Sequence, residues 1–147
     1  MNNMNIWTYI KEKKQERKEA KAFAKRLKAS GLHFPILCKL HGVTSPTHQG
    51  AIAQSRASDE LQIVHTPTPE FPDRVSVYSI SLNRTLGFLE DTLSKKLIFA
   101  FGAGFCRDGE VKAVTGGAPH PYFGCNIRIL DTKEFLQDCE DFSHLYE

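Results

Sequence analysis

DELQIVHTPTPEFPDRVSVYSISLNRTLGFL, residues 59–89, is the most informative stretch of this chain of 147 residues about its fold. Apolar residues alternate with polar ones over 60–65 and again over 74–80, a period typical of β-strands. Three prolines fall within residues 66–73, and proline lacks the N–H that a central strand requires. The stretch therefore predicts two short strands joined by a stiff loop that presents Phe71.

Further strands are expected from the same kind of pattern. Each is a run of alternating apolar residues bounded by glycine, proline or polar turn residues. They cover residues 33–40, 85–88, 110–117 and 124–130, with a glycine-punctuated connection over 102–111. Five or six short strands at roughly ten-residue spacing favour a small β-barrel.

Helices are expected before, within and after the barrel. Residues 5–30 are rich in Lys, Glu, Ala and Leu, which favour helices. A repeat of apolar residues every four positions predicts another helix over 90–101, and a capping box predicts a third from Asp131 or Thr132. Residues 41–50 are expected to be turns, and 51–58 a short helix or an irregular crossover. The predicted class is α+β, mainly β, with a basic helix (1–31) and a barrel domain (32–147).

The composition is that of a globular chain, with 41% hydrophobic and 24% charged residues. No apolar run approaches the roughly 20 residues that cross a bilayer. The N-terminal residues also lack the pattern of a secretory signal. We therefore expect no membrane partner and a cytoplasmic location. The cysteines are scattered and are expected to be free thiols, mostly buried: Cys38, Cys106, Cys125 and Cys139.

The net charge of +2 is unevenly distributed along the chain. Residues 1–30 hold nine Lys or Arg and three Glu, whereas residues 131–147 hold six acidic residues and one Lys. The basic helix could lie along phosphates, or be a solvated helix docked through Phe23 and Leu27. It could also recruit a protein partner or form a homo-oligomer, because the oppositely charged ends can attract each other.

Catalytic and metal-binding patterns are missing from the sequence. Its adjacent acidic residues Asp59-Glu60 and Glu90-Asp91 fit the start of a strand or helix rather than a catalytic pair. It has no HExxH motif, and residues 102–104 lack the Lys-Ser/Thr of a phosphate loop. Cys106, His120 and Cys125 would supply three metal ligands, with a spacing too long for a zinc knuckle. We therefore expect a protein that is not an enzyme and holds no cofactor. The loop 116–125 is interpreted as a second aromatic platform or a structural cap.

The order of the short motifs resembles the HIRAN domain family, over roughly residues 34–101. The motifs are a strand followed by Gly42-Val43, a strand led by Asp59-Glu60, the loop to Phe71, the strand Val75-Ser76-Val77 and the step Leu86-Gly87-Phe88-Leu89 into a helix. The resemblance implies an OB- or SH3-like barrel. Family members occur alone in bacteria or fused to helicases and nucleases. The best-understood ones hold the 3′ end of single-stranded DNA in a pocket.

The resemblance also implies roles for particular residues. Phe71 takes the place of a loop tyrosine on which the terminal base stacks, but it lacks the hydroxyl. Asp73 lies near the place of the loop aspartate. Thr44 and Ser45 stand where the DNA-end binders carry an Arg-Tyr pair, so neither the guanidinium nor the second ring is present. Thr68 lies where the family has Asn-Pro.

Basic side chains flank the same loops and could contact phosphates from one groove. They could equally be scattered surface residues, and His41 and His65 could be capped core histidines. The expected nucleic-acid-binding residues are Thr44, Ser45, His48, His65, Thr68, Phe71, Asp73 and Arg74. The expected function is non-catalytic recognition of single-stranded or branched DNA, including 3′ ends, in DNA repair or processing. The alternative is a protein-interaction adaptor that uses the basic helix and the acidic C-terminal segment.

Overall fold

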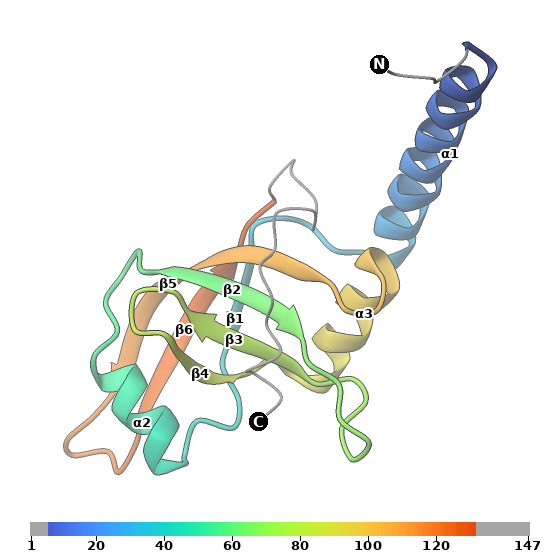
Figure 1. Ribbon diagram of the computed structural model, residues 1–147. Coiled ribbons are helices and arrows are strands. Elements are labelled where there is room, and N and C mark those ends of the chain that lie inside the picture. Colours follow the sequence, from blue (N-terminus) through green and yellow to red (C-terminus); the bar gives the residue numbers. More distant parts are fainter. Residues whose placement is uncertain (1–5, 132–147) are drawn as a thin grey trace.

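The computed structural model describes residues 6–131, which form six strands and three helices (Figure 1). In chain order the elements are α1 (Ile6–Ser30), β1 (Ile36–Lys39), α2 (Pro46–Ala53), β2 (Glu60–His65), β3 (Val75–Ser79), β4 (Arg84–Phe88), α3 (Asp91–Phe101), β5 (Cys106–Gly116) and β6 (Phe123–Ile129). The predicted C-terminal helix falls on 132–147, outside the described residues. The predicted α+β class is confirmed.

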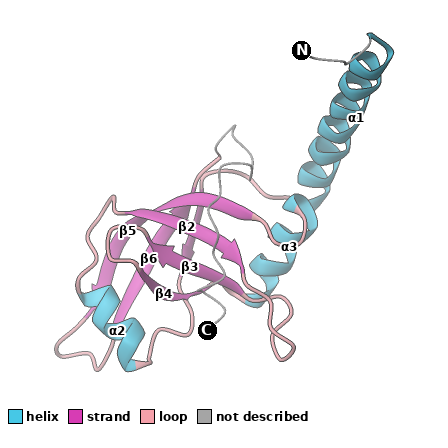
Figure 2. Ribbon diagram, in the orientation of Figure 1, coloured by secondary structure: helices cyan, strands magenta, loops and turns pink. Residues whose placement is uncertain are grey.

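All six strands belong to one antiparallel sheet with the order β1-β6-β5-β2-β3-β4. The sheet curls into a half-barrel, as Figure 2 shows. Its two edges meet at one point, where the His41 N–H donates to the Phe88 carbonyl at 2.8 Å and the Phe88 N–H donates back at 2.9 Å. This pair pins the chain after β1 to the end of β4.

Two glycines permit the edges to approach this closely. A Cβ atom on Gly87 would lie 2.7 Å from the His41 carbonyl oxygen. Gly42 has a φ of +65°, and a Cβ atom there would lie 2.6 Å from the Phe88 ring. Glycine avoids both the clash and the strain of the left-handed conformation. The Gly-Val and Leu-Gly-Phe-Leu steps in the sequence therefore mark the place where the sheet closes.

Apolar side chains fill the interior of the half-barrel. Val75 and Val77 of β3 are fully buried there, and Phe105 is buried just before β5. The helices α2 and α3 lie at opposite ends of the sheet (Figure 1). From them, Ile52 and Leu97 complete the core.

Helix α1 projects away from the half-barrel (Figure 1). Only its last part docks, with the Phe23 ring 5.4 Å from the ring of Phe101 in α3 and Leu27 packed against the same core. Toward its free end, Ile6 and Trp7 are 68% and 70% exposed. Within the described residues, no helix combines the length and apolarity needed to cross a membrane.

Two local predictions were wrong. Turns were expected over 41–50, but α2 begins at Pro46. The Ser45 side chain caps this helix by accepting from the His48 N–H at 3.2 Å, and proline suits the first helical position. A connection was expected over 102–111, but β5 begins at Cys106. Position 109 within this strand suits glycine, because the Cβ atom of any other residue would lie only 2.8 Å from a β6 carbonyl oxygen.

Candidate nucleic-acid interface

The proline loop between β2 and β3 has a defined shape that comes from its own hydrogen bonds. The Thr68 N–H donates to the Phe71 carbonyl, and the Phe71 N–H donates to the Thr68 carbonyl, both at 3.1 Å. The Thr68 hydroxyl also accepts from the Phe71 N–H at 3.0 Å. These bonds close a turn with Pro69 and Glu70 at its tip. The turn leaves the Phe71 ring 53% exposed.

His65 holds this loop from the interior. Its Nδ1 atom accepts the Gly104 N–H at 2.8 Å, so the ring proton sits on Nε2. Nε2 then donates to the Pro72 carbonyl, also at 2.8 Å. The ring is 4% exposed and stacks on Phe105. His65 therefore has the role of a satisfied core histidine and takes no part in the surface described below.

Arg74 lies between two aromatic rings at the end of the same loop. Its guanidinium carbon is 4.5 Å from the centre of the Phe71 ring and 4.6 Å from the centre of the Phe88 ring. Both distances are within the range of a cation–π contact. The two rings belong to different elements, the loop and the end of β4. Stacking thus fixes the position of a cation that remains half-exposed.

His48 extends this arrangement from α2. Its ring meets the Phe88 ring edge to face, with centres 5.4 Å apart. Its Nδ1 atom donates to the Gly42 carbonyl at 2.7 Å, because a carbonyl can only accept. Ser45 serves this site indirectly, by capping α2, and Thr44 is exposed just before it.

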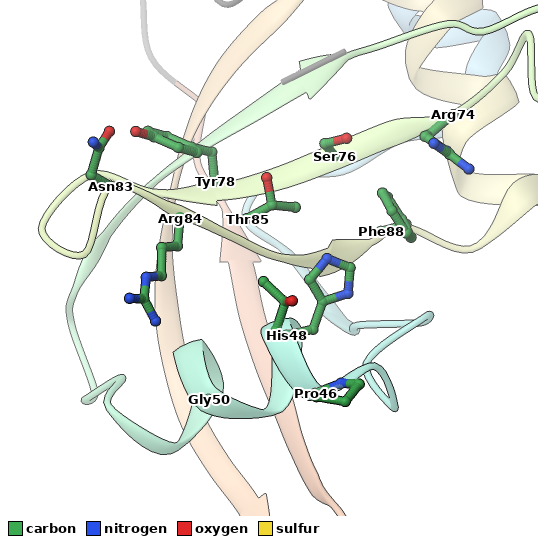
Figure 3. Close-up of a pocket in the computed structure, with 11 residues that line it drawn as sticks. Pro46, His48, Gly50, Arg74, Ser76, Tyr78, Asn83, Arg84, Thr85 and Phe88 are labelled. Carbon is green, nitrogen blue, oxygen red and sulfur yellow. The ribbon is translucent and has the colours of Figure 1, made fainter. Parts of the chain in front are cut away.

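Arg74 and Phe88 form the common wall of two cavities. The larger has a volume of about 770 Å³ and lies between α2 and the strands β3 and β4 (Figure 3). We call it the cationic cavity, because its lining includes Arg74 and Arg84, with His48 beside them, and among residues 6–131 it includes no carboxylate. Hydroxyl and amide groups complete the polar lining, from Thr47, Ser76, Tyr78, Asn83 and Thr85.

The smaller cavity, of about 420 Å³, lies on the Phe71 side of Arg74. We call it the acidic cavity, because Glu70, Asp73 and Asp91 all line it. Asp91 is paired with Lys95 at 3.1 Å, and this carboxylate raises the pKa of Lys95. The two cavities adjoin at Arg74 and Phe88, and the charge of their linings changes sign there. We call the two cavities together the groove.

A third cavity, of about 340 Å³, lies beside the 116–125 loop and includes the half-exposed Tyr122 in its lining. Phe123 packs against the core, and its N–H donates to the Gln49 side chain at 2.8 Å. The Gln49 side-chain NH2 group donates to the Phe123 carbonyl at 2.9 Å. The base of this loop thus ties α2 to β6, as expected of a structural cap.

The residues considered for a metal do not come together. Cys125 pairs with Val114 in the sheet. Cys106 comes eight residues before Val114 in β5, a separation of about 26 Å along an extended strand. Among residues 6–131, no cluster of His, Cys, Asp and Glu could hold a metal ion. Burial raises the pKa of the Cys38 and Cys125 thiols to about 11, so both stay protonated at neutral pH. The three cysteines in this part of the chain are free, as predicted.

The structure brings together four of the eight predicted site residues: His48, Phe71, Asp73 and Arg74. Thr68 shapes the turn that carries Phe71. Ser45 caps α2, and His65 holds the proline loop from the interior. Phe88 was missed as a site residue because the Gly87-Phe88 step was interpreted as a marker of the fold. Arg84 was considered only as one of several scattered cations.

No protein-family model, curated protein or solved structure matches the chain.

Proposed function

We propose that this protein is a non-catalytic nucleic-acid-binding module, and that the groove holds single-stranded DNA or the single-stranded end of branched DNA. The observation that carries the proposal is the Arg74 guanidinium held between the Phe71 and Phe88 rings. This arrangement of one cation and two rings can make two kinds of interaction with a nucleotide. A phosphate can pair with the cation, and a base can stack on the exposed face of Phe71, at about 1–3 kcal/mol per base.

The charge of the groove supports one placement for the end of the bound strand. Phosphates favour the cationic cavity, where Arg74 and Arg84 meet no carboxylate from the described part of the chain. The acidic cavity repels phosphates, but the Asp73 carboxylate can accept a hydrogen bond from a sugar hydroxyl. A strand would therefore enter along the cationic cavity and end at Phe71, with a free terminal hydroxyl toward Asp73, and the HIRAN resemblance implies that this is the 3′-OH.

The test is a fluorescence anisotropy titration of a short 3′-OH single strand against wild type, Arg74→Gln and Arg56→Gln. Both substitutions remove one positive charge, but Arg56 lines neither cavity. We expect Arg74→Gln to weaken binding about tenfold or more, and Arg56→Gln to weaken it less than twofold. Equal losses, or no binding by the wild type, would reject the groove as the site.

A second candidate function is that of a protein-interaction adaptor. It is favoured by the apolar side chains exposed near the free end of α1, which are Ile6, Trp7 and Tyr9. Analytical ultracentrifugation discriminates between the two candidates. A salt-sensitive self-association without DNA binding favours the adaptor, and DNA binding by a monomer favours the groove.

A further inference from the structure

Six lysines lie along one face of α1. Lys11, Lys14, Lys18, Lys21, Lys25 and Lys28 follow each other at alternating intervals of three and four residues, which keeps side chains in one line on a helix. All six are exposed. We call this row the lysine stripe. At a rise of 1.5 Å per residue it is about 25 Å long, and Trp7 continues the same spacing toward the free end.

The acidic residues of α1 lie on the opposite face. Glu12, Glu16 and Glu19 share the spacing that continues to Phe23 and Leu27, the two residues that dock on the core. Glu16 is paired with Lys13, at 3.3 Å, which is outside the stripe. Among residues 6–131, no stripe lysine forms an ion pair. The positive charge of the stripe is therefore not neutralised by its own helix.

The shape and charge of the stripe match a straight polyanion. Lysine is a flexible point charge, suited to phosphates rather than to the planar recognition of base edges. Duplex DNA carries one negative charge per about 1.7 Å of its axis and is straight over much more than 25 Å. A single strand offers neither this charge density nor this stiffness. We propose that the lysine stripe binds the phosphate backbone of duplex DNA.

This inference deepens the proposed function and rests on it, because it assigns the duplex part of a branched or tailed DNA to α1. Helix α3 joins the two surfaces: Asp91 and Ser94 near its start line the acidic cavity, and Phe101 at its end contacts Phe23 of α1. Its 11 residues correspond to about 16 Å. A DNA with a single-stranded end and an adjoining duplex is long enough to reach both.

The test compares two double variants of the same helix. Lys18→Gln with Lys21→Gln removes two charges from the stripe, and Lys13→Gln with Arg26→Gln removes two from outside it. Glutamine is a good helix former, and circular dichroism checks that both variants keep their helix. The affinity of each is measured over a range of salt concentrations for a duplex, a duplex with a 3′ single-stranded tail, and a single strand.

For both DNAs that contain duplex, we expect the stripe variant to reduce the slope of log affinity against log salt by about 1.8, or 0.9 per lost phosphate contact. The single strand should bind as tightly as before, and the control variant should keep the wild-type slopes. Equal changes in both variants would overturn the proposal, because they would indicate diffuse charge rather than a stripe.

Two other outcomes would also overturn it. One is an unchanged duplex slope together with loss of self-association in ultracentrifugation, which would assign the stripe to a second copy of the chain. The other is an unchanged duplex slope together with lost binding to vesicles containing anionic lipid. Failure of the groove is distinguishable from both, because Arg74→Gln would then leave single-strand binding unchanged while the stripe variant still altered the duplex slope.

Discussion

The interior and the groove both carry polar side chains, but they hold them in different ways. In the interior, His65 is buried and both of its ring nitrogens have backbone partners. In the groove, Arg74 and His48 are half-exposed and line a cavity of about 770 Å³. The interior residues thus maintain the fold, whereas the groove residues are positioned by it. Substitutions in the two regions should therefore change different properties.

The largest effect is expected at His65. His65→Ala removes a buried ring that stacks on Phe105, together with its hydrogen bonds to the Gly104 N–H and the Pro72 carbonyl. The cavity left by a buried ring and the loss of two hydrogen bonds each destabilise the fold, so we expect a loss of about 3 kcal/mol in the free energy of unfolding. Urea denaturation measures it.

His48→Ala is the matched control for this change. It removes an edge-to-face ring contact and a single hydrogen bond to Gly42 at a half-exposed site, so stability should fall by no more than about 1 kcal/mol. Equal destabilisation by the two histidine variants would contradict the distinction between interior and groove.

A somewhat smaller effect is expected at the closing point of the sheet. Gly87→Ala places a methyl group 2.7 Å from the His41 carbonyl oxygen, and such overpacking costs about 1–3 kcal/mol. The loss should appear as a lower melting temperature. A melting temperature equal to that of the wild type would show that the two edges do not depend on this close approach.

Gly50→Ala is the control for the glycine change. Gly50 lies within α2, and a Cβ atom there would meet nothing within 4 Å. Alanine is favoured over glycine in a helix by about 0.5–1 kcal/mol, so this variant should be as stable as the wild type or slightly more so.

In the groove, Phe71→Ala should change binding rather than stability. The ring is 53% exposed, so its removal should alter the free energy of unfolding by less than about 0.5 kcal/mol. Affinity for a single strand should fall about tenfold, because a stacking surface is lost. Isothermal titration and urea denaturation of one preparation measure both. Loss of stability without loss of binding would reverse our assignment of this residue.

The smallest effect on affinity is expected from a change in the chemical group at the 3′ end of the DNA. A 3′-phosphate would approach Glu70, Asp73 and Asp91 in the acidic cavity, so it should bind a few times more weakly than a 3′-OH strand. Asp73→Asn should reduce this preference. A 5′-phosphate on the same strand is the control, and it should have no comparable effect. Equal affinity for both 3′ ends would show that the strand does not end at Phe71.

Much of the fold was predictable because its signals are local. The alternating residues of β2 and β3, the four-residue repeat of α3 and the composition of α1 each indicated the correct element. The start of β5 at Cys106 was not predictable in this way, because its pairing with Val64 of β2 is long-range. The start of helix α2 was missed although the Ser45-Pro46 step, a cap followed by proline at the first helical position, is a recognisable signal.

The site was predictable in part. The proline loop pointed to Phe71 and Arg74, but the partnership of Arg74 with Phe88 depends on how the loop and β4 meet in space. The sequence left His65 open between a DNA contact and a core histidine. Its hydrogen bonds to the backbone of Gly104 and Pro72 identify it as a core histidine. No local pattern reveals the contact with Gly104, which is 39 residues away.

The most direct test of the groove is NMR mapping of a short single strand titrated into the protein. We predict chemical-shift changes in the Arg74 side-chain resonance and in the amides of Phe71, Phe88 and His48, with those of the 116–122 loop unchanged. Changes confined to that loop or to α1, with the Arg74 resonance unmoved, would show that single-stranded DNA does not bind in the groove.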